Sequence, residues 1–244
     1  MHKSLAELDA GLQSVPISSS VDRRTAARDL LVVMLSIGVA WLGTKHILYP
    51  ALGVPGNAPM VLRPILGFLV AWALLRMSRQ NWSHFGLSRP RGLVGCLGVA
   101  IALYGVVYLA TMVLVPFLGS VFPVRSEPVF LLYIRGNVAA YLGWLAIAWL
   151  VGGFIEELLF RGFLINRVES LFGNAPGSTA IAILAQAVLF GTLHLYQGAY
   201  GFVFAGTLAV LYGVAYVVLG RNLWPLIIVH GTWNSIAISR LYGL

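Results

Sequence analysis

The chain has 244 residues, of which 59% are hydrophobic and 10% are charged, and its mean hydropathy is +0.87. This composition excludes a water-soluble globular class, because a soluble surface cannot carry so many apolar side chains, and it predicts a membrane protein. The 16 Lys and Arg give a net charge of +8 but lie scattered between apolar runs, which favours contact with lipid headgroups and argues against a nucleic-acid partner.

The first 28 residues are polar and basic, whereas the rest of the chain is dominated by apolar runs. We therefore expect residues 1–28 to form a cytoplasmic tail and residues 29–244 to form a single transmembrane domain. A helix needs roughly 20 apolar residues to cross a bilayer, and seven runs are long enough. Segments rich in Gly, Pro or basic residues separate them. The expected spans are 29–49, 60–77, 92–118, 138–165, 179–196, 200–219 and 223–242.

These runs predict an all-α, polytopic transmembrane helix bundle of about seven spans that encloses a polar intramembrane site. An arrangement of eight, with one short or re-entrant segment, stays open. With a cytoplasmic N-terminus, eleven Lys and Arg lie on the cytoplasmic side and five on the other. This bias favours a multi-pass protein with its N-terminus inside. The short loops suit a bacterial inner (plasma) membrane.

Two adjacent glutamates lie inside the fourth expected span. A carboxylate in hydrocarbon costs at least ~2.5 kcal/mol on insertion scales, so the pair needs partners and a water-filled cavity. At 3.6 residues per turn, Glu157 and Arg161 share a face and are expected to pair, while Glu156 points about 100° away. Glu156 is therefore suited to take a proton from water and pass it on. The alternative is that both glutamates form a structural ion-pair network.

Two later segments add imidazole and amide groups. Phe190 and His194 close the fifth span, where His194 alone is as consistent with packing as with catalysis. His230 and Asn234 are four residues apart in the last span and face the same side. An imidazole and an amide on one face can donate jointly to one oxygen atom, as an oxyanion site for acyl transfer requires.

The three segments together resemble a known family. Residues 156–161 fit EExxxR, residues 190–194 fit FxxxH and residues 230–234 fit HxxxN. These are motifs of the CPBP intramembrane proteases, also called the CAAX amino-terminal protease or Abi family, which includes the type II prenyl-protein endopeptidases. The resemblance covers approximately residues 140–240, whereas the first three spans match only in hydrophobicity.

The resemblance implies an intramembrane endopeptidase that acts on a peptide or membrane-protein substrate. In such an enzyme Glu156 and His194 activate a water, while His230 and Asn234 hold the oxyanion. The residues then expected to orient the site are Glu157, Arg161 and Phe190.

A metal stays open as an alternative for this site. Glu156, His194 and His230 are residue types that bind zinc, and the family is often labelled a metalloprotease. The same groups could instead position a water directly, without a cofactor. HExxH is absent from the sequence, which favours the metal-free mechanism.

Two other function classes stay open. A noncatalytic scaffold or bacteriocin-immunity-type protein could share the fold, although all three motifs are complete here. A small ion-coupled transporter would also need intramembrane carboxylates, although paired halves with broken helices are not evident. One expectation conflicts with a shared site, because a fifth span that starts at Thr179 would put His194 nearer the outer side than Glu156.

Overall fold

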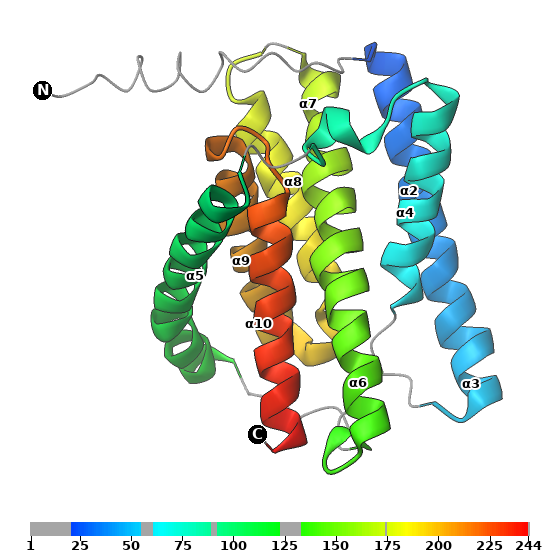
Figure 1. Cartoon of the computed structure of the whole chain (residues 1–244). Coiled ribbons are helices and arrows are strands. Elements are labelled where there is room, and N and C mark those ends of the chain that lie inside the picture. The colour runs from blue at the N-terminus through cyan, green and yellow to red at the C-terminus, as the bar shows by residue number, and fades with distance from the viewer. Residues whose placement is uncertain (1–20, 55–60, 89–91, 123–132, 174, 244) are drawn as a thin grey trace, which may run out of the picture.

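The computed structural model describes residues 21–54, 61–88, 92–122, 133–173 and 175–243. Within these ranges the regular elements are all helical, which confirms the all-α class (Figure 1). The first 20 residues of the expected tail lie outside this part of the chain.

Each expected span corresponds to one helical segment of the described chain. Four segments are long and apolar enough to cross a membrane, namely Arg23–Leu52, Leu93–Val121, Val138–Phe172 and Leu195–Val218. In chain order, the elements are α2 (Arg23–Gly43), η1 (Thr44–Leu48), α3 (Tyr49–Leu52), α4 (Leu62–Met77), η2 (Trp82–Phe85), α5 (Leu93–Val121), α6 (Val138–Ile147), η4 (Ala148–Leu164), α7 (Ile165–Phe172), α8 (Ser178–Leu193), η5 (Leu195–Gln197), α9 (Gly198–Val218) and α10 (Trp224–Tyr242).

The first helix begins earlier than the sequence predicts. The Asp22 carboxylate accepts hydrogen bonds from the backbone N–H groups of Arg24 and Thr25, at 3.0 and 3.1 Å. This cap starts α2 at Arg23, six residues before the expected start of the first span at residue 29.

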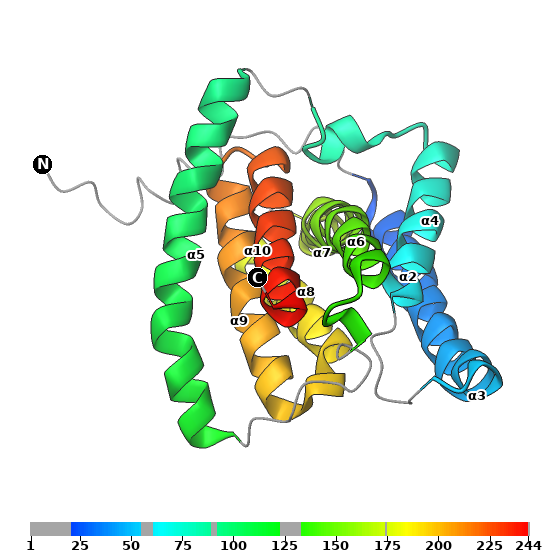
Figure 2. The same ribbon diagram turned by 60° about the horizontal axis from the view of Figure 1, so that its bottom comes forward.

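The continuous helix made of α6, η4 and α7 lies at the centre of the bundle. Figure 2 shows it between the α2–α4 pair on one side and α10, α9 and α5 on the other. Its neighbouring residues Leu158 and Leu159 are fully buried in two different apolar clusters. Leu159 belongs to the cluster that includes side chains from α2 and α4. Leu158 belongs to the cluster that includes side chains from α9 and α10. Hydrocarbon packing on both sides thus holds the glutamate-bearing turns in place.

The middle of this helix differs from the expected α geometry. Residues Ala148–Leu164 form a π-helix, and the N–H of Ile165 accordingly bonds to the carbonyl of Phe160, five residues earlier. Helices of this kind are rare and occur often at functional sites. Because a π-helix is wider, the angle of about 100° between Glu156 and Glu157, expected for an α-helix, does not apply.

Small residues bring η4 and α10 close together. A Cβ atom added to Gly153 would lie 3.2 Å from the backbone of Gly231 in α10. The missing side chain of Gly153 allows the α10 backbone to approach, and that of Gly231 leaves room for the Trp149 ring. This contact brings the turn that carries Glu156 against the turn that carries His230.

Buried ion pairs anchor the end of the bundle around α7. Arg167 Nε donates to Asp29 Oδ2 at 3.0 Å with both side chains fully buried, and Arg221 Nη2 lies 2.9 Å from Glu169 Oε1. The sequence suggested that scattered arginines face lipid headgroups. For Arg167 this is wrong, because its side chain joins α7 to α2 inside the protein.

Candidate active site

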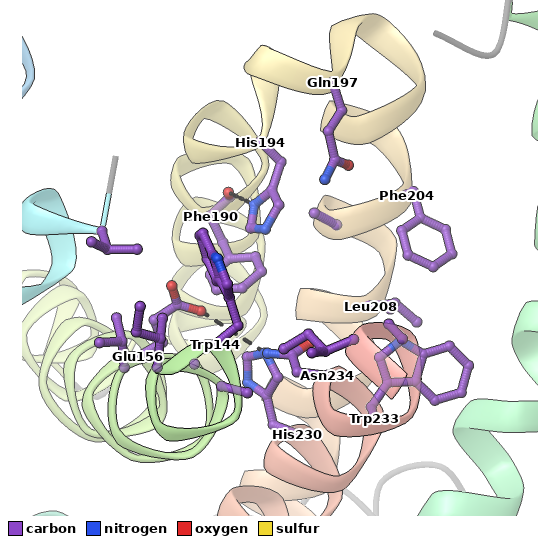
Figure 3. Close-up of a pocket in the computed structure, with 18 of the residues that line it drawn as sticks. Trp144, Glu156, Phe190, His194, Gln197, Phe204, Leu208, His230, Trp233 and Asn234 are labelled. Atoms are coloured by element: carbon purple, nitrogen blue, oxygen red, sulfur yellow. Dashed lines mark hydrogen bonds and ion pairs between the residues drawn. The ribbon is translucent and has the colours of Figure 1, made fainter. Parts of the chain in front are cut away.

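A cavity of about 340 Å³ lies inside the bundle, with walls from α6, η4, α8, η5, α9 and α10. Glu156, His194, His230 and Asn234 all line it, although three separate helical segments carry them (Figure 3). The rest of the wall is mostly apolar. Its large apolar residues include Trp144, Phe204, Leu208 and Trp233.

The two glutamates have different environments. Glu157 is fully buried, and its Oε1 accepts from Arg161 Nη1 at 3.0 Å and lies 2.7 Å from His230 Nδ1. The Glu156 side chain keeps 14% of its surface exposed, lines the cavity and places Oε2 3.9 Å from His230 Nε2. The His230 ring therefore lies between two carboxylates, of which only Glu156 faces the cavity.

Arg161 is held by rings as well as by Glu157. Its guanidinium carbon lies 4.8 Å from the centre of the Phe190 ring and 5.1 Å from that of the Tyr212 ring. A planar cation between aromatic faces gains cation–π attraction that strengthens as water is excluded. The Phe190 ring also lies 4.9 Å from the His194 ring and 6.2 Å from the His230 ring, so it packs between the two histidines.

His194 reaches the cavity because α8 is short. The 16 residues of Ser178–Leu193 span about 24 Å, less than the roughly 30 Å of a bilayer core. The helix therefore ends at the level of the cavity, which removes the conflict in depth between His194 and Glu156. His194 Nδ1 lies 3.0 Å from the Phe190 carbonyl, which can only accept, so Nδ1 carries the proton and Nε2 of the neutral ring is an acceptor.

Asn234 follows His230 by one turn of α10, and both side chains converge on Gly152. A Cβ atom at Gly152 would collide with Asn234 Nδ2 and would lie 3.8 Å from His230 Nε2. The absence of a side chain at this position thus leaves room for two nitrogen atoms beside the cavity. Two such groups can serve one oxyanion.

Three polar residues near this site were not identified from the sequence. Tyr196 and Gln197 line the cavity from η5, but directly before Gly198 they have the pattern of an ordinary turn. The third residue is Arg63 of α4, whose Nη2 donates to the Leu193 carbonyl at 2.9 Å. One signal in the sequence could have identified Tyr196, since it lies only two residues after His194, the last residue of the FxxxH motif.

The zinc ligands considered from the sequence are Glu156, His194 and His230. Among the described residues, no three side chains of His, Cys, Asp or Glu gather in a group that could hold a metal ion. The chemistry proposed below therefore uses these three side chains without a metal.

Comparison with known proteins identifies part of the chain. Residues 138–236 match the family described as Type II CAAX prenyl endopeptidase Rce1-like. This match confirms the resemblance to the CPBP/CAAX proteases for the segment from α6 into α10, which carries all the candidate site residues. It supports, in general terms, an intramembrane protease of the CAAX type. No curated protein and no solved structure matches the chain significantly.

Proposed function

From this CAAX-protease domain, we propose that the protein is an intramembrane endopeptidase that hydrolyses a bond in a peptide or membrane-protein substrate. The observation that best supports this proposal is the position of Glu156. Its carboxylate lines a mostly apolar cavity, and its Oε2 lies 3.9 Å from His230 Nε2. A carboxylate kept in such a place, beside imidazole and amide groups, has the parts that water activation and oxyanion binding require.

The reaction begins with a water between Glu156 and the substrate. Its oxygen attacks the carbonyl carbon while one proton passes to Glu156, and His194 Nε2 accepts a hydrogen bond that orients it. Negative charge develops on the former carbonyl oxygen, where Asn234 Nδ2 and His230 Nε2 donate. Glu156 then gives its proton to the amide nitrogen, and the C–N bond breaks to leave an acid and an amine.

Glu157 acts through His230 as a positioning residue. Its Oε1 accepts the Nδ1 proton at 2.7 Å, so His230 donates to the oxyanion through Nε2 only when the ring carries both protons. The buried Glu157 carboxylate is the counter-charge of that imidazolium, and it fixes the ring orientation toward the cavity.

We also propose that the protein lies in a bacterial inner membrane with its N-terminus in the cytoplasm. The start of α2 and the end of α10 lie at opposite ends of the bundle (Figure 1), as an odd number of crossings requires. The excess of Lys and Arg on the N-terminal side supports this orientation.

The test compares the wild-type protein with Glu156→Gln in lipid vesicles. Both are incubated with a set of internally quenched apolar peptides, and cleavage is followed by fluorescence and mass spectrometry. We expect cleavage by the wild type only, with both proteins folded to the same extent by circular dichroism. Equal cleavage by the two proteins would contradict the role of Glu156, and no cleavage by either would contradict the peptidase function and favour a noncatalytic role.

A further inference from the structure

The turn η5 contributes two polar side chains to the cavity that the proposed chemistry does not use. Tyr196 and Gln197 line the same space as Glu156 and His194. The turn is held tightly, because a Cβ atom at Gly201 would lie 2.7 Å from the His194 carbonyl and 2.8 Å from Gln197 Oε1. Gly201 therefore allows η5 to fold back on α9 with the Gln197 oxygen toward the helix.

The hydrogen bond inside this turn has a definite direction. Gln197 Nε2 donates to Tyr196 Oη at 2.9 Å. A phenol that accepts from an amide still holds its own proton for another acceptor. Tyr196 is thus a hydrogen-bond donor placed in the cavity, and Gln197 holds it there.

Tyr196 lies near the proposed reacting groups. Its ring centre is 6.0 Å from that of His194. The hydroxyl is close enough to Glu156 and to Arg63 to interact electrostatically with both. Tyr196 therefore lines the η5 side of the cavity that contains Glu156.

A peptide in this cavity needs hydrogen-bond donors. The lining is mostly apolar, and a peptide carbonyl left without a partner in such surroundings costs free energy of the order of a lost hydrogen bond. Asn234 and His230 serve the carbonyl under attack. A carbonyl of a neighbouring residue requires a different donor, and the Tyr196 hydroxyl is suitably placed.

We propose that Tyr196 binds the substrate by donating a hydrogen bond from Oη to a backbone carbonyl oxygen of the peptide, with Gln197 as its positioning residue. This inference rests on the proposed peptidase function. The contact is present in the bound substrate and in the transition state alike, so it affects the Michaelis constant more than the turnover number.

The first experiment uses a quenched apolar peptide that the wild type cleaves and Glu156→Gln does not. We expect Tyr196→Phe to raise KM by roughly 3- to 10-fold, the range of one neutral hydrogen bond, with kcat changed by less than about 2-fold. Tyr200→Phe is the matched control, because Tyr200 itself does not line the cavity and the variant keeps the ring that stacks on Phe204, so it should keep the wild-type KM.

The second experiment reverses the hydrogen bond. A carboxylate can only accept, so Gln197→Glu takes the phenol proton away from the substrate while Tyr196 remains. We expect Gln197→Glu to raise KM about as much as Tyr196→Phe does. The double variant, with both Tyr196→Phe and Gln197→Glu, should have a KM no higher than that of Tyr196→Phe alone. A double variant clearly worse than Tyr196→Phe would mean that the added charge, and not the lost donor, causes the effect, and it would contradict the role of Gln197.

A binding measurement separates this inference from the proposed function. The same peptide is titrated into Glu156→Gln and into Glu156→Gln with Tyr196→Phe, and we expect a 3- to 10-fold weaker Kd in the second. An unchanged KM and Kd for Tyr196→Phe, with Glu156→Gln inactive, would overturn the role of Tyr196 alone. Absence of any Glu156-dependent cleavage would overturn both proposals.

Discussion

His230 Nδ1 lies 2.7 Å from Glu157 Oε1, inside the protein, while the opposite nitrogen of the ring faces the cavity. The same Glu157 oxygen accepts from Arg161, so one buried carboxylate serves two cationic or donor groups from two helices. Glu156, only one residue earlier, faces the cavity. We therefore predict that replacing Glu157 and replacing Glu156 have different effects on the stability of the protein.

Glu157→Gln is expected to destabilise the fold. It leaves the fully buried Arg161 without a charged partner, and breaking a buried pair in this way costs about 3–5 kcal/mol. Glu156→Gln should change the free energy of unfolding by less than about 1 kcal/mol, because its side chain faces the cavity. Thermal unfolding in detergent measures both variants. Equal midpoints would contradict the different roles of the two carboxylates.

Arg161→Lys is predicted to weaken the site although it keeps the charge. An ammonium cannot lie as a plane between the Phe190 and Tyr212 rings, and we expect a loss of about 1–3 kcal/mol in stability together with lower activity. Arg76→Lys is the control, because Arg76 is exposed and lies over a single ring, that of Trp72. If the two variants unfold at the same temperature, stacking does not hold Arg161.

The membrane spans could be predicted from local pattern alone. Each apolar run of about 20 residues is bounded by Gly, Pro or charged residues, and that information is contained within the run itself. The pairing of Glu157 with Arg161 was also readable, because four residues bring two side chains together on a helix. Boundaries set by a single cap, as at Asp22, were harder to locate.

Features that depend on packing between distant segments could not be predicted. Arg167 pairs with Asp29 across 138 residues, and no local pattern distinguishes it from an exposed arginine. The π-helix at Ala148–Leu164 depends on how η4 fits against its neighbours. The contribution of Tyr196 depends on the depth at which α8 ends, which the hydropathy of a span does not determine.

Removal of metal ions tests the chemistry of the site. Because Glu156, His194 and His230 do not gather as a ligand set, we expect dialysis against EDTA and 1,10-phenanthroline to leave peptide cleavage within about 2-fold of the untreated enzyme. Elemental analysis of the purified protein should then show less than stoichiometric zinc. A loss of activity that added zinc restores would contradict the metal-free mechanism while leaving the peptidase function intact.

Gly152→Ala tests the oxyanion site through its shape. The added methyl group would occupy the place of Asn234 Nδ2, so the Asn234 amide must move, whereas His230 Nε2 at 3.8 Å is only in ordinary contact. We expect kcat to fall roughly 10- to 100-fold, as when one oxyanion donor is lost, with little change in the unfolding temperature.

Gly143→Ala is the matched control for this substitution. Nothing lies within 4 Å of a Cβ atom at Gly143, and replacing a helical glycine by alanine adds stability of about 0.5–1 kcal/mol. Activity should therefore stay at the wild-type level in Gly143→Ala. If Gly152→Ala also keeps full activity, Asn234 does not need its present position, and its assignment to the oxyanion site is wrong.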